Sequence, residues 1–183
     1  MATRFGFRVL AAAAVAAWAL GGCSSGGATP SESPTVASPT TTAPTTDAGA
    51  ITAACPLVDV ATVESTFSVT NVQTTENEPV MTGPVTTYSC DYSDGGEAFV
   101  TVGVAVGPAV GSVEENIRAA LSNATGEPVE GLGEGGAYAE TGGVGTAAGI
   151  KKVGSEYRLV FAHGAAGSKD QIVAVAREAA TKI

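Results

Sequence analysis

Residues 85–106 read VTTYSCDYSDGGEAFVTVGVAV and contain two runs in which apolar and polar residues alternate. In the first run Tyr88, Cys90 and Tyr92 fall on one side, and in the second every other residue after the phenylalanine is a valine. Alternation with a period of two is typical of a strand with one buried face. The glycine pair in SDGG favours a tight turn between the runs. The stretch therefore predicts a β-hairpin and, with it, an antiparallel sheet.

Three amphipathic segments around this hairpin are predicted to be helices. In the first, CPLVDVATVESTF, Asp59 can accept a hydrogen bond at the N-terminus of a short helix. The other two begin with capping boxes, Ser112-x-x-Glu115 and Ser168-x-x-Gln171. The apolar residues expected to face the core are Val60, Val63 and Phe67 in the first helix, Val113, Ile117, Ala120 and Leu121 in the second, and Ile172, Val175, Ala176, Ala179 and Ile183 in the third.

A second hairpin is predicted from Gly142 to Ala162, with its turn near Gly154. Three of its residues, Tyr157, Leu159 and Phe161, share one face. Strands joined in hairpins and separated by helices predict an α+β fold, an antiparallel sheet with amphipathic helices packed on it. Because each hairpin is followed by a capped helix, the order also indicates two similar hairpin–helix halves.

Residues 1–22 have the three parts of an export signal: a basic head, an apolar run from Val9 to Leu20, and small residues after it. The run has 12 residues, whereas a membrane-spanning helix takes roughly 20. Leu20-Gly21-Gly22-Cys23 resembles the bacterial lipobox, in which the cysteine receives a diacylglycerol and the chain is cut before it. We therefore expect a lipid on Cys23 to hold the protein at the extracytoplasmic face of the cell membrane. The alternative is an ordinary signal peptide with an accidental cysteine.

The composition changes abruptly after Cys23, because residues 24–50 are almost entirely Ser, Thr, Pro, Gly and Ala. Such a segment cannot bury enough apolar surface to offset its ordering entropy. We expect residues 23–50 to form a lipidated, disordered tether and residues 51–183 to form one globular domain.

The predicted domain contains two cysteines, Cys55 and Cys90. An oxidising compartment favours a disulfide between them, and in the chain-entropy model a loop of about 36 residues closed in this way stabilises by about 4 kcal/mol. Two separate buried thiols are the alternative.

The charge is acidic and unevenly distributed. The formal net charge is −9, and between Ile51 and Ile117 nine acidic residues occur with no lysine or arginine. This argues against nucleic acid, whose phosphates require a basic face. Solubility is the simplest use of such acidity. The candidates for contact with a partner in this segment are Glu76, Glu78, Asp94 and Glu97.

Two motifs suggest ligands but lack the context that those ligands require. GLGEGG matches G-x-G-x-x-G from Gly131 to Gly136, yet no buried strand precedes it and no helix follows, so we expect no nucleotide. Asp91, Asp94 and Glu97 surround the first predicted turn, but their spacing is not that of a calcium-binding loop. We therefore predict neither a metal nor a cofactor.

His163 is the only histidine, and its position at the end of a predicted strand indicates a solvated loop residue. No serine motif of a hydrolase accompanies it in a suitable strand-turn-helix context. Lys151 and Lys152, beside Arg158, are interpreted as a small basic spot on a solvated strand edge.

Three short motifs occur in order along the predicted domain: Cys-Pro-Leu-Val from Cys55, SCDY at residues 89–92, and GLGEGGAYAE at residues 131–140. Together they resemble a family of actinobacterial cell-surface lipoproteins grouped as a domain of unknown function. The resemblance covers most of residues 55–183. It implies a surface lipoprotein with a Cys55–Cys90 disulfide, and it transfers no catalytic residue. The chain departs from the family pattern at Tyr92, where a tryptophan is more usual.

Two classes of function are compatible with these features. The first is a non-enzymatic, membrane-anchored binding domain for a protein or another envelope ligand, such as a lipid. The second is an envelope hydrolase or transferase that uses dispersed residues such as Asp91, Asp94 and His163. An enzyme should show a deep pocket lined by at least two of these groups, whereas a binding domain should show an exposed apolar or charged patch.

Overall fold

The computed structural model describes residues 49–183. The predicted signal peptide, Cys23 and residues 24–48 of the predicted tether lie outside the described residues. Within the described range, every helix is too short or too polar to cross a bilayer.

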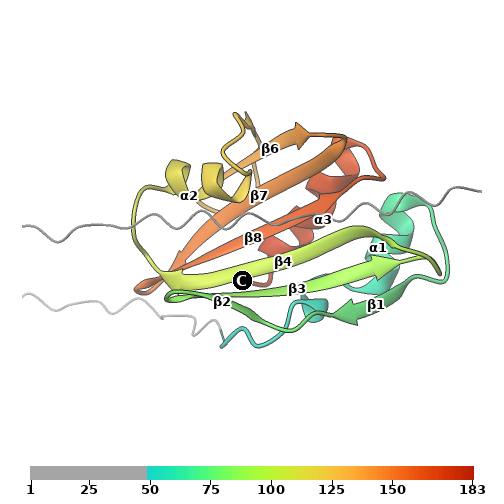
Figure 1. Ribbon diagram of the computed structural model, residues 1–183, viewed down its shortest axis with the longest axis horizontal. Helices are drawn as coiled ribbons and strands as arrows, with labels where there is room; N and C mark the ends of the chain where they lie inside the picture. Colours follow the sequence, from blue (N-terminus) through green and yellow to red (C-terminus); the bar gives the residue numbers. More distant parts are fainter. Residues whose placement is uncertain (1–48) are drawn as a thin grey trace, which may run out of the picture. The chain divides into compact units, whose positions relative to one another are not determined.

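The described chain forms an α+β fold, as predicted, with an eight-stranded antiparallel sheet (Figure 1). The strand order is β1-β3-β4-β8-β7-β6-β5, and β2 pairs with β3 as well. The elements, in chain order, are η1 (Cys55–Leu57), α1 (Val60–Phe67), β1 (Gln73–Glu76), β2 (Val80–Thr82), β3 (Val85–Ser93), β4 (Ala98–Pro108), α2 (Val113–Ala120), β5 (Glu127–Pro128), β6 (Gly135–Thr141), β7 (Val144–Val153), β8 (Glu156–Gly164) and α3 (Lys169–Ala180).

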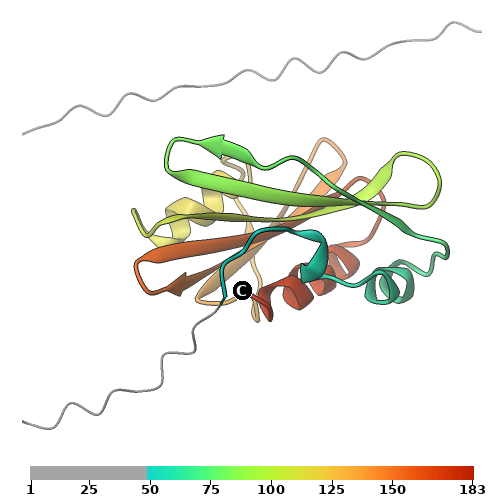
Figure 2. The same ribbon diagram turned by 90° about the horizontal axis from the view of Figure 1, so that it is seen from below.

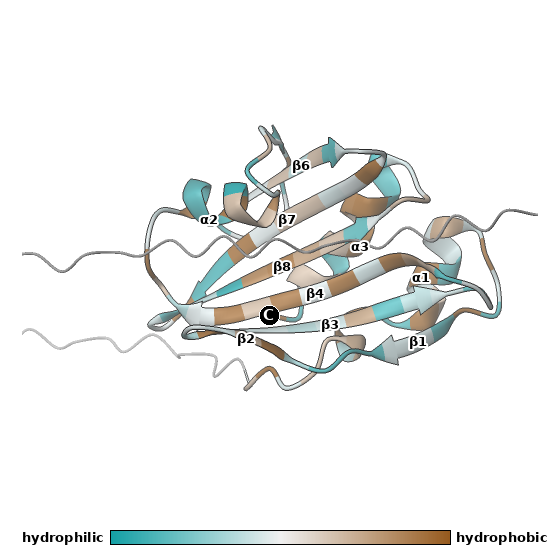
Figure 3. Cartoon of the chain, in the orientation of Figure 1, coloured by the Kyte–Doolittle hydropathy of each residue, from teal (hydrophilic) through white to brown (hydrophobic). Residues whose placement is uncertain are grey.

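The hairpin predicted from residues 85–106 is confirmed as β3 and β4. Cys90 pairs with Val102 and Tyr92 with Val100, so the two alternating runs place their apolar residues on the same face of the sheet. All four of these side chains are fully buried. Figure 3 shows that the apolar residues concentrate on β4 and β8, the central strands. The alternation of apolar and polar residues therefore identifies the face of β3 and β4 that is buried in the core.

The three predicted helices are also confirmed, together with their caps. The Asp59 carboxylate accepts a hydrogen bond from the Thr62 amide at 2.8 Å. Both capping boxes are complete, at the N-termini of α2 and α3. Every residue predicted to face the core is buried or partly buried. Because each cap satisfies amide groups that have no partner within the helix, the caps fix where the helices begin.

The helices cover the two faces of the sheet unequally. One face, here called the α3 face, packs against α1 and α3, which lie together in Figure 2. The opposite face, here called the α2 face, packs against α2, which lies mainly over β6, β7 and β8. Residues of β8 alternate between the two, with Val160 facing α3 and Leu159 facing α2. The half of the α2 face formed by β3 and β4 is therefore not covered by a helix.

The prediction of two similar halves holds for the strands and is wrong for the helices. The hairpins β3–β4 and β7–β8 meet side by side through β4 and β8, and each is followed by a helix. However, the helix after β4 packs on one face of the sheet and the helix after β8 on the other. The two hairpin–helix units therefore differ in three dimensions.

Four strands of the sheet, β1, β2, β5 and β6, were not predicted, and the longest of them is β6. It pairs with β7 across a turn formed by Gly142 and Gly143, whose φ angles are 62° and 81°. Its own glycines allow close packing, because a Cβ at Gly136 would lie 2.5 Å from the Cβ of Leu132. The glycines of the GLGEGG segment thus serve turns and close packing.

Candidate functional site

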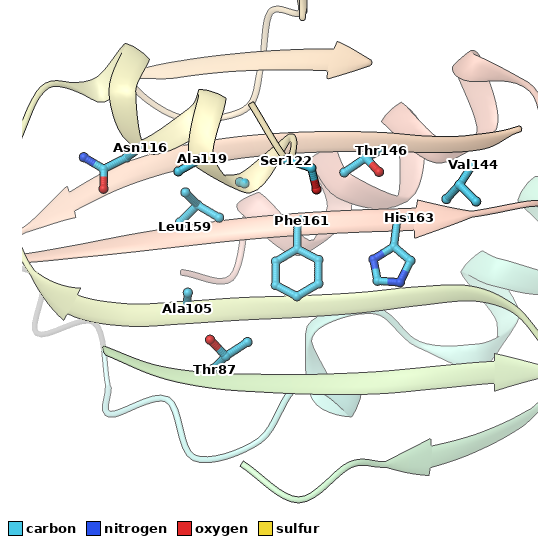
Figure 4. Close-up of a pocket in the computed structure, with 11 residues that line it drawn as sticks. Thr87, Ala105, Asn116, Ala119, Ser122, Val144, Thr146, Leu159, Phe161 and His163 are labelled. Carbon is cyan, nitrogen blue, oxygen red and sulfur yellow. The ribbon is translucent and has the colours of Figure 1, made fainter. Parts of the chain in front are cut away.

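On the α2 face, a groove of about 580 Å³ runs over β7 and β8 between α2 and the uncovered strands β3 and β4 (Figure 4). Its size lies within the range of small-molecule sites, about 300–1,000 Å³. The residues that line it come from five elements and the residue after α2's C-cap: Thr87, Ala105, Asn116, Ala119, Ala120, Ser122, Val144, Thr146, Leu159, Phe161 and His163. Apolar side chains of β4 and β8 form its floor, and polar side chains of β3, β7 and α2 stand at its rim. The sequence did not reveal this groove.

Two aromatic rings lie side by side on the floor of the groove. The rings of Phe161 and His163 are nearly parallel, with 8° between their planes and 5.8 Å between their centroids. Figure 4 shows both rings face-on to the viewer. Phe161 occupies the space above Gly103, where a Cβ would lie only 2.2 Å from the ring's Cζ. The missing side chain at Gly103 therefore lets Phe161 lie flat against β4.

A row of polar residues crosses three strands at the His163 end of the groove. In the strand register Asp91 pairs with Thr101 and Thr101 pairs with His163. The Thr101 hydroxyl donates a hydrogen bond to the Asp91 carboxylate at 2.5 Å. Burial lowers the pKa of His163, and the negative charge of Asp91 opposes this shift. The imidazole is therefore mainly neutral at pH 7.

The prediction that His163 is a solvated loop residue is wrong. The residue belongs to β8, its side chain is partly buried, and its ring packs beside that of Phe161. The strand extends to Gly164 because pairing with β4 and β7 continues through His163. Propensity alone does not show this pairing.

The four acidic residues proposed as a partner surface lie away from the groove. Asp94 and Glu97 are exposed in the turn between β3 and β4, and Glu78 is exposed between β1 and β2. The carboxylate of Glu76 has a local role, because it accepts hydrogen bonds from the amides of Ala54 and Cys55, each at 2.7 Å.

The disulfide between Cys55 and Cys90 is present and joins η1 to β3. The Glu76 carboxylate lies near both sulfur atoms, but sulfurs bonded to each other are not thiolate ligands for a metal. Beside the disulfide, the Tyr92 hydroxyl donates a hydrogen bond to the Val58 carbonyl oxygen at 2.5 Å. Burial raises the pKa of Tyr92 to about 12, with smaller contributions from the charges of Glu76 and Asp59. This region is therefore a structural junction.

The predicted basic spot does not form on the surface. Arg158 is only 4% exposed and faces the side of the sheet covered by α3. The Lys151 ammonium donates a hydrogen bond to the carbonyl oxygen of Ile183, and Lys152 is exposed. The interpretation as a solvated cluster is wrong for Arg158, because the alternation of β8 turns this residue inward.

A second groove, of about 430 Å³, lies between α2 and the segment before β6. It includes Gly135 and Gly136 of the glycine-rich segment, with Glu114, Arg118 and Glu134 among its lining residues. Because two carboxylates and one guanidinium line this groove, its net negative charge makes it a poor site for phosphate.

Comparisons with known proteins identify no family for this chain. The sequence matches no model of a known protein family. No curated protein matches it either. Among solved structures, the extracellular domain of PknH from Mycobacterium tuberculosis is similar, with 12% sequence identity, coverage of 70% of this chain and 93% of that chain, and a TM-score of 0.36. A TM-score this low supports no inference about function, and the resemblance to actinobacterial lipoproteins stays a prediction.

Proposed function

We propose that this protein is a non-enzymatic, exported binding protein that holds a small envelope ligand in the groove on the α2 face. The observation that carries the proposal is the groove itself, which has an apolar floor and a polar rim and lies between α2 and the strands that no helix covers. This combination is typical of a site for a small ligand.

The arrangement of the candidate catalytic residues favours binding over hydrolysis. Of Asp91, Asp94 and His163, His163 alone is among the groove's lining residues. Thr101 lies between Asp91 and His163 in the register, and its hydroxyl donates a hydrogen bond to the Asp91 carboxylate. A catalytic triad instead places the histidine between the nucleophile and the acid. Within residues 49–183 this geometry supplies no activated nucleophile.

The disulfide supports a location outside the cytoplasm, since such bonds persist in oxidising compartments. In this proposal the lipid on Cys23 anchors the protein to the extracytoplasmic face of the membrane, and residues 23–50 hold the domain away from the bilayer. Glu78, Asp94 and Glu97 remain a proposed contact surface for a protein partner. Glu76 is no longer included, because its carboxylate accepts hydrogen bonds from backbone amides at the start of η1.

The proposal is tested with two matched substitutions of exposed helical alanines. Ala119 lies on α2 and lines the groove, whereas Ala174 lies on α3, on the other side of the sheet. The full-length protein is purified from the cells that produce it, and small molecules bound to it are identified by native mass spectrometry. Ala119→Arg should reduce their occupancy about tenfold or more, which corresponds to about 1.4 kcal/mol of binding free energy.

Ala174→Arg is the control and should retain the bound molecule at the occupancy of the wild type. Equal occupancy in the two variants would show that the molecule binds elsewhere, and an absence of bound molecules in every sample would contradict the proposed function.

A further inference from the structure

The floor of the groove is shaped for a flat ring. The rings of Phe161 and His163 are adjacent and nearly parallel, and Gly103 leaves room for the Phe161 ring close to the backbone of β4. The neighbouring floor residues, Ala105 and Leu159, are apolar. Aromatic rings bind by offset stacking on surfaces of this kind.

The charges around the groove favour a cation. No lysine or arginine is among the residues that line it. The carboxylate of Asp91, at the His163 end of the groove, is only partly buried, and its hydrogen bond from Thr101 uses one of its two oxygens. A carboxylate can accept up to about four hydrogen bonds, so the other oxygen can accept a donor from a ligand. Because burial lowers the pKa of His163, the imidazole does not repel a cation at pH 7.

We infer that the ligand of this groove is a small molecule with a flat aromatic ring and a protonated amine, the ring lying on Phe161 and His163 and the amine directed toward Asp91. The inference rests on the proposed function and specifies its ligand class. Fatty acids, phospholipid headgroups and nucleotides are disfavoured, because they would bring negative charge to a site with a carboxylate and no basic side chain among its lining residues.

The test uses three probes that carry the same indole ring and differ in charge: tryptamine is cationic, tryptophol is neutral and indole-3-propionate is anionic. Each is titrated into the isotope-labelled full-length protein, and amide chemical shifts are followed at pH 7 and low salt. We expect tryptamine to shift the amides around Phe161 and His163 and to bind about tenfold more tightly than indole-3-propionate, with tryptophol between them.

Asp91→Asn isolates the contribution of the carboxylate. In this variant the preference for tryptamine should fall to less than about threefold, while binding of tryptophol stays unchanged, because the ring platform is intact. Asp94→Asn, three residues further in the exposed turn, is the matched control and should keep the wild-type preference. Dispersed amide spectra of both variants establish that they are folded.

Equal affinity for tryptamine and indole-3-propionate at the groove would overturn the inferred ligand class and leave the groove as a binding site. A charge preference retained in Asp91→Asn would overturn the assigned role of that carboxylate. If none of the probes shifts groove amides at millimolar concentration, the inferred ligand class is wrong, and the comparison of Ala119→Arg with Ala174→Arg separately decides the proposed function.

Discussion

Glu76 shows how one exposed side chain can act on the fold. Its two carboxylate oxygens accept hydrogen bonds from the amides of Ala54 and Cys55, at the entrance to η1. These amides lie at the start of a helical turn, where amide groups have no acceptor in the helix. The sequence indicated an acidic surface residue, whereas the structure assigns Glu76 the role of a cap supplied from a neighbouring strand.

Replacement of Glu76 by alanine should lower the free energy of unfolding by about 1–2 kcal/mol, because two amides lose a charged acceptor. Glu78→Ala, two residues away and exposed, is the control and should change it by less than about 0.5 kcal/mol. Urea unfolding followed by circular dichroism measures both. Equal free energies of unfolding for Glu76→Ala and Glu78→Ala would contradict the capping role of Glu76.

Tyr92 makes stability depend on pH in the alkaline range. Its buried phenol has a pKa of about 12, above the ordinary value of 10.0, so the folded state favours the neutral form. This contribution to stability is complete below pH 10 and is lost as the pH rises toward 12. The free energy of unfolding of the wild type should therefore fall more steeply between pH 10 and 12 than that of Tyr92→Phe. The free energy of unfolding is measured by urea titration at each pH. If it falls equally with pH in the wild type and in Tyr92→Phe, the assignment to Tyr92 is wrong.

At the scale of elements, the disulfide ties η1 to β3 across a sequence separation of 35 residues. Because η1 and α1 pack on the α3 face, this bond holds the start of the domain against its core. The stabilisation acts on the unfolded chain, whose loop is closed by the bond.

Reduction of this disulfide should lower the free energy of unfolding by about 4 kcal/mol, the value expected for a loop of about 36 residues. The measurement is urea unfolding with and without reductant. A Cys55→Ser/Cys90→Ser double variant should have the same free energy of unfolding with and without reductant. Alkylation of Cys55 or Cys90 in the unreduced protein, detected by peptide mass spectrometry, would contradict the bond itself.

The elements that the sequence predicted are those with a clear period or a cap. β3, β4 and β8 contain alternating runs, and the helices combine capping residues with an apolar stripe. By contrast, β1 is QTTE with every residue exposed, so it shows no alternation. β6 is rich in glycine and alanine, whose β propensity is low, and it is a strand because it pairs with β7 and β5.

At the scale of the whole molecule, the groove exists because α2 and α3 pack on opposite faces of the sheet. Sequence patterns show that α2 has one apolar side, but they do not show that α2 crosses to β7 and packs opposite α3. That placement leaves β3 and β4 uncovered on the α2 face. One local signal did exist: Gly103 lies between Val102 and Val104 in β4, and a glycine inside a strand often marks a close approach.

Amide hydrogen exchange tests the central claim, that the groove on the α2 face is occupied, whatever the chemical identity of the ligand. Protein purified from its own cells is compared with the same protein after unfolding, dialysis and refolding with its disulfide intact. Removal of the ligand should speed exchange in α2 and β8, which border the groove, and leave residues 73–82 unchanged. Faster exchange confined to residues 73–82 and the β3–β4 turn, or identical exchange throughout, would contradict the account.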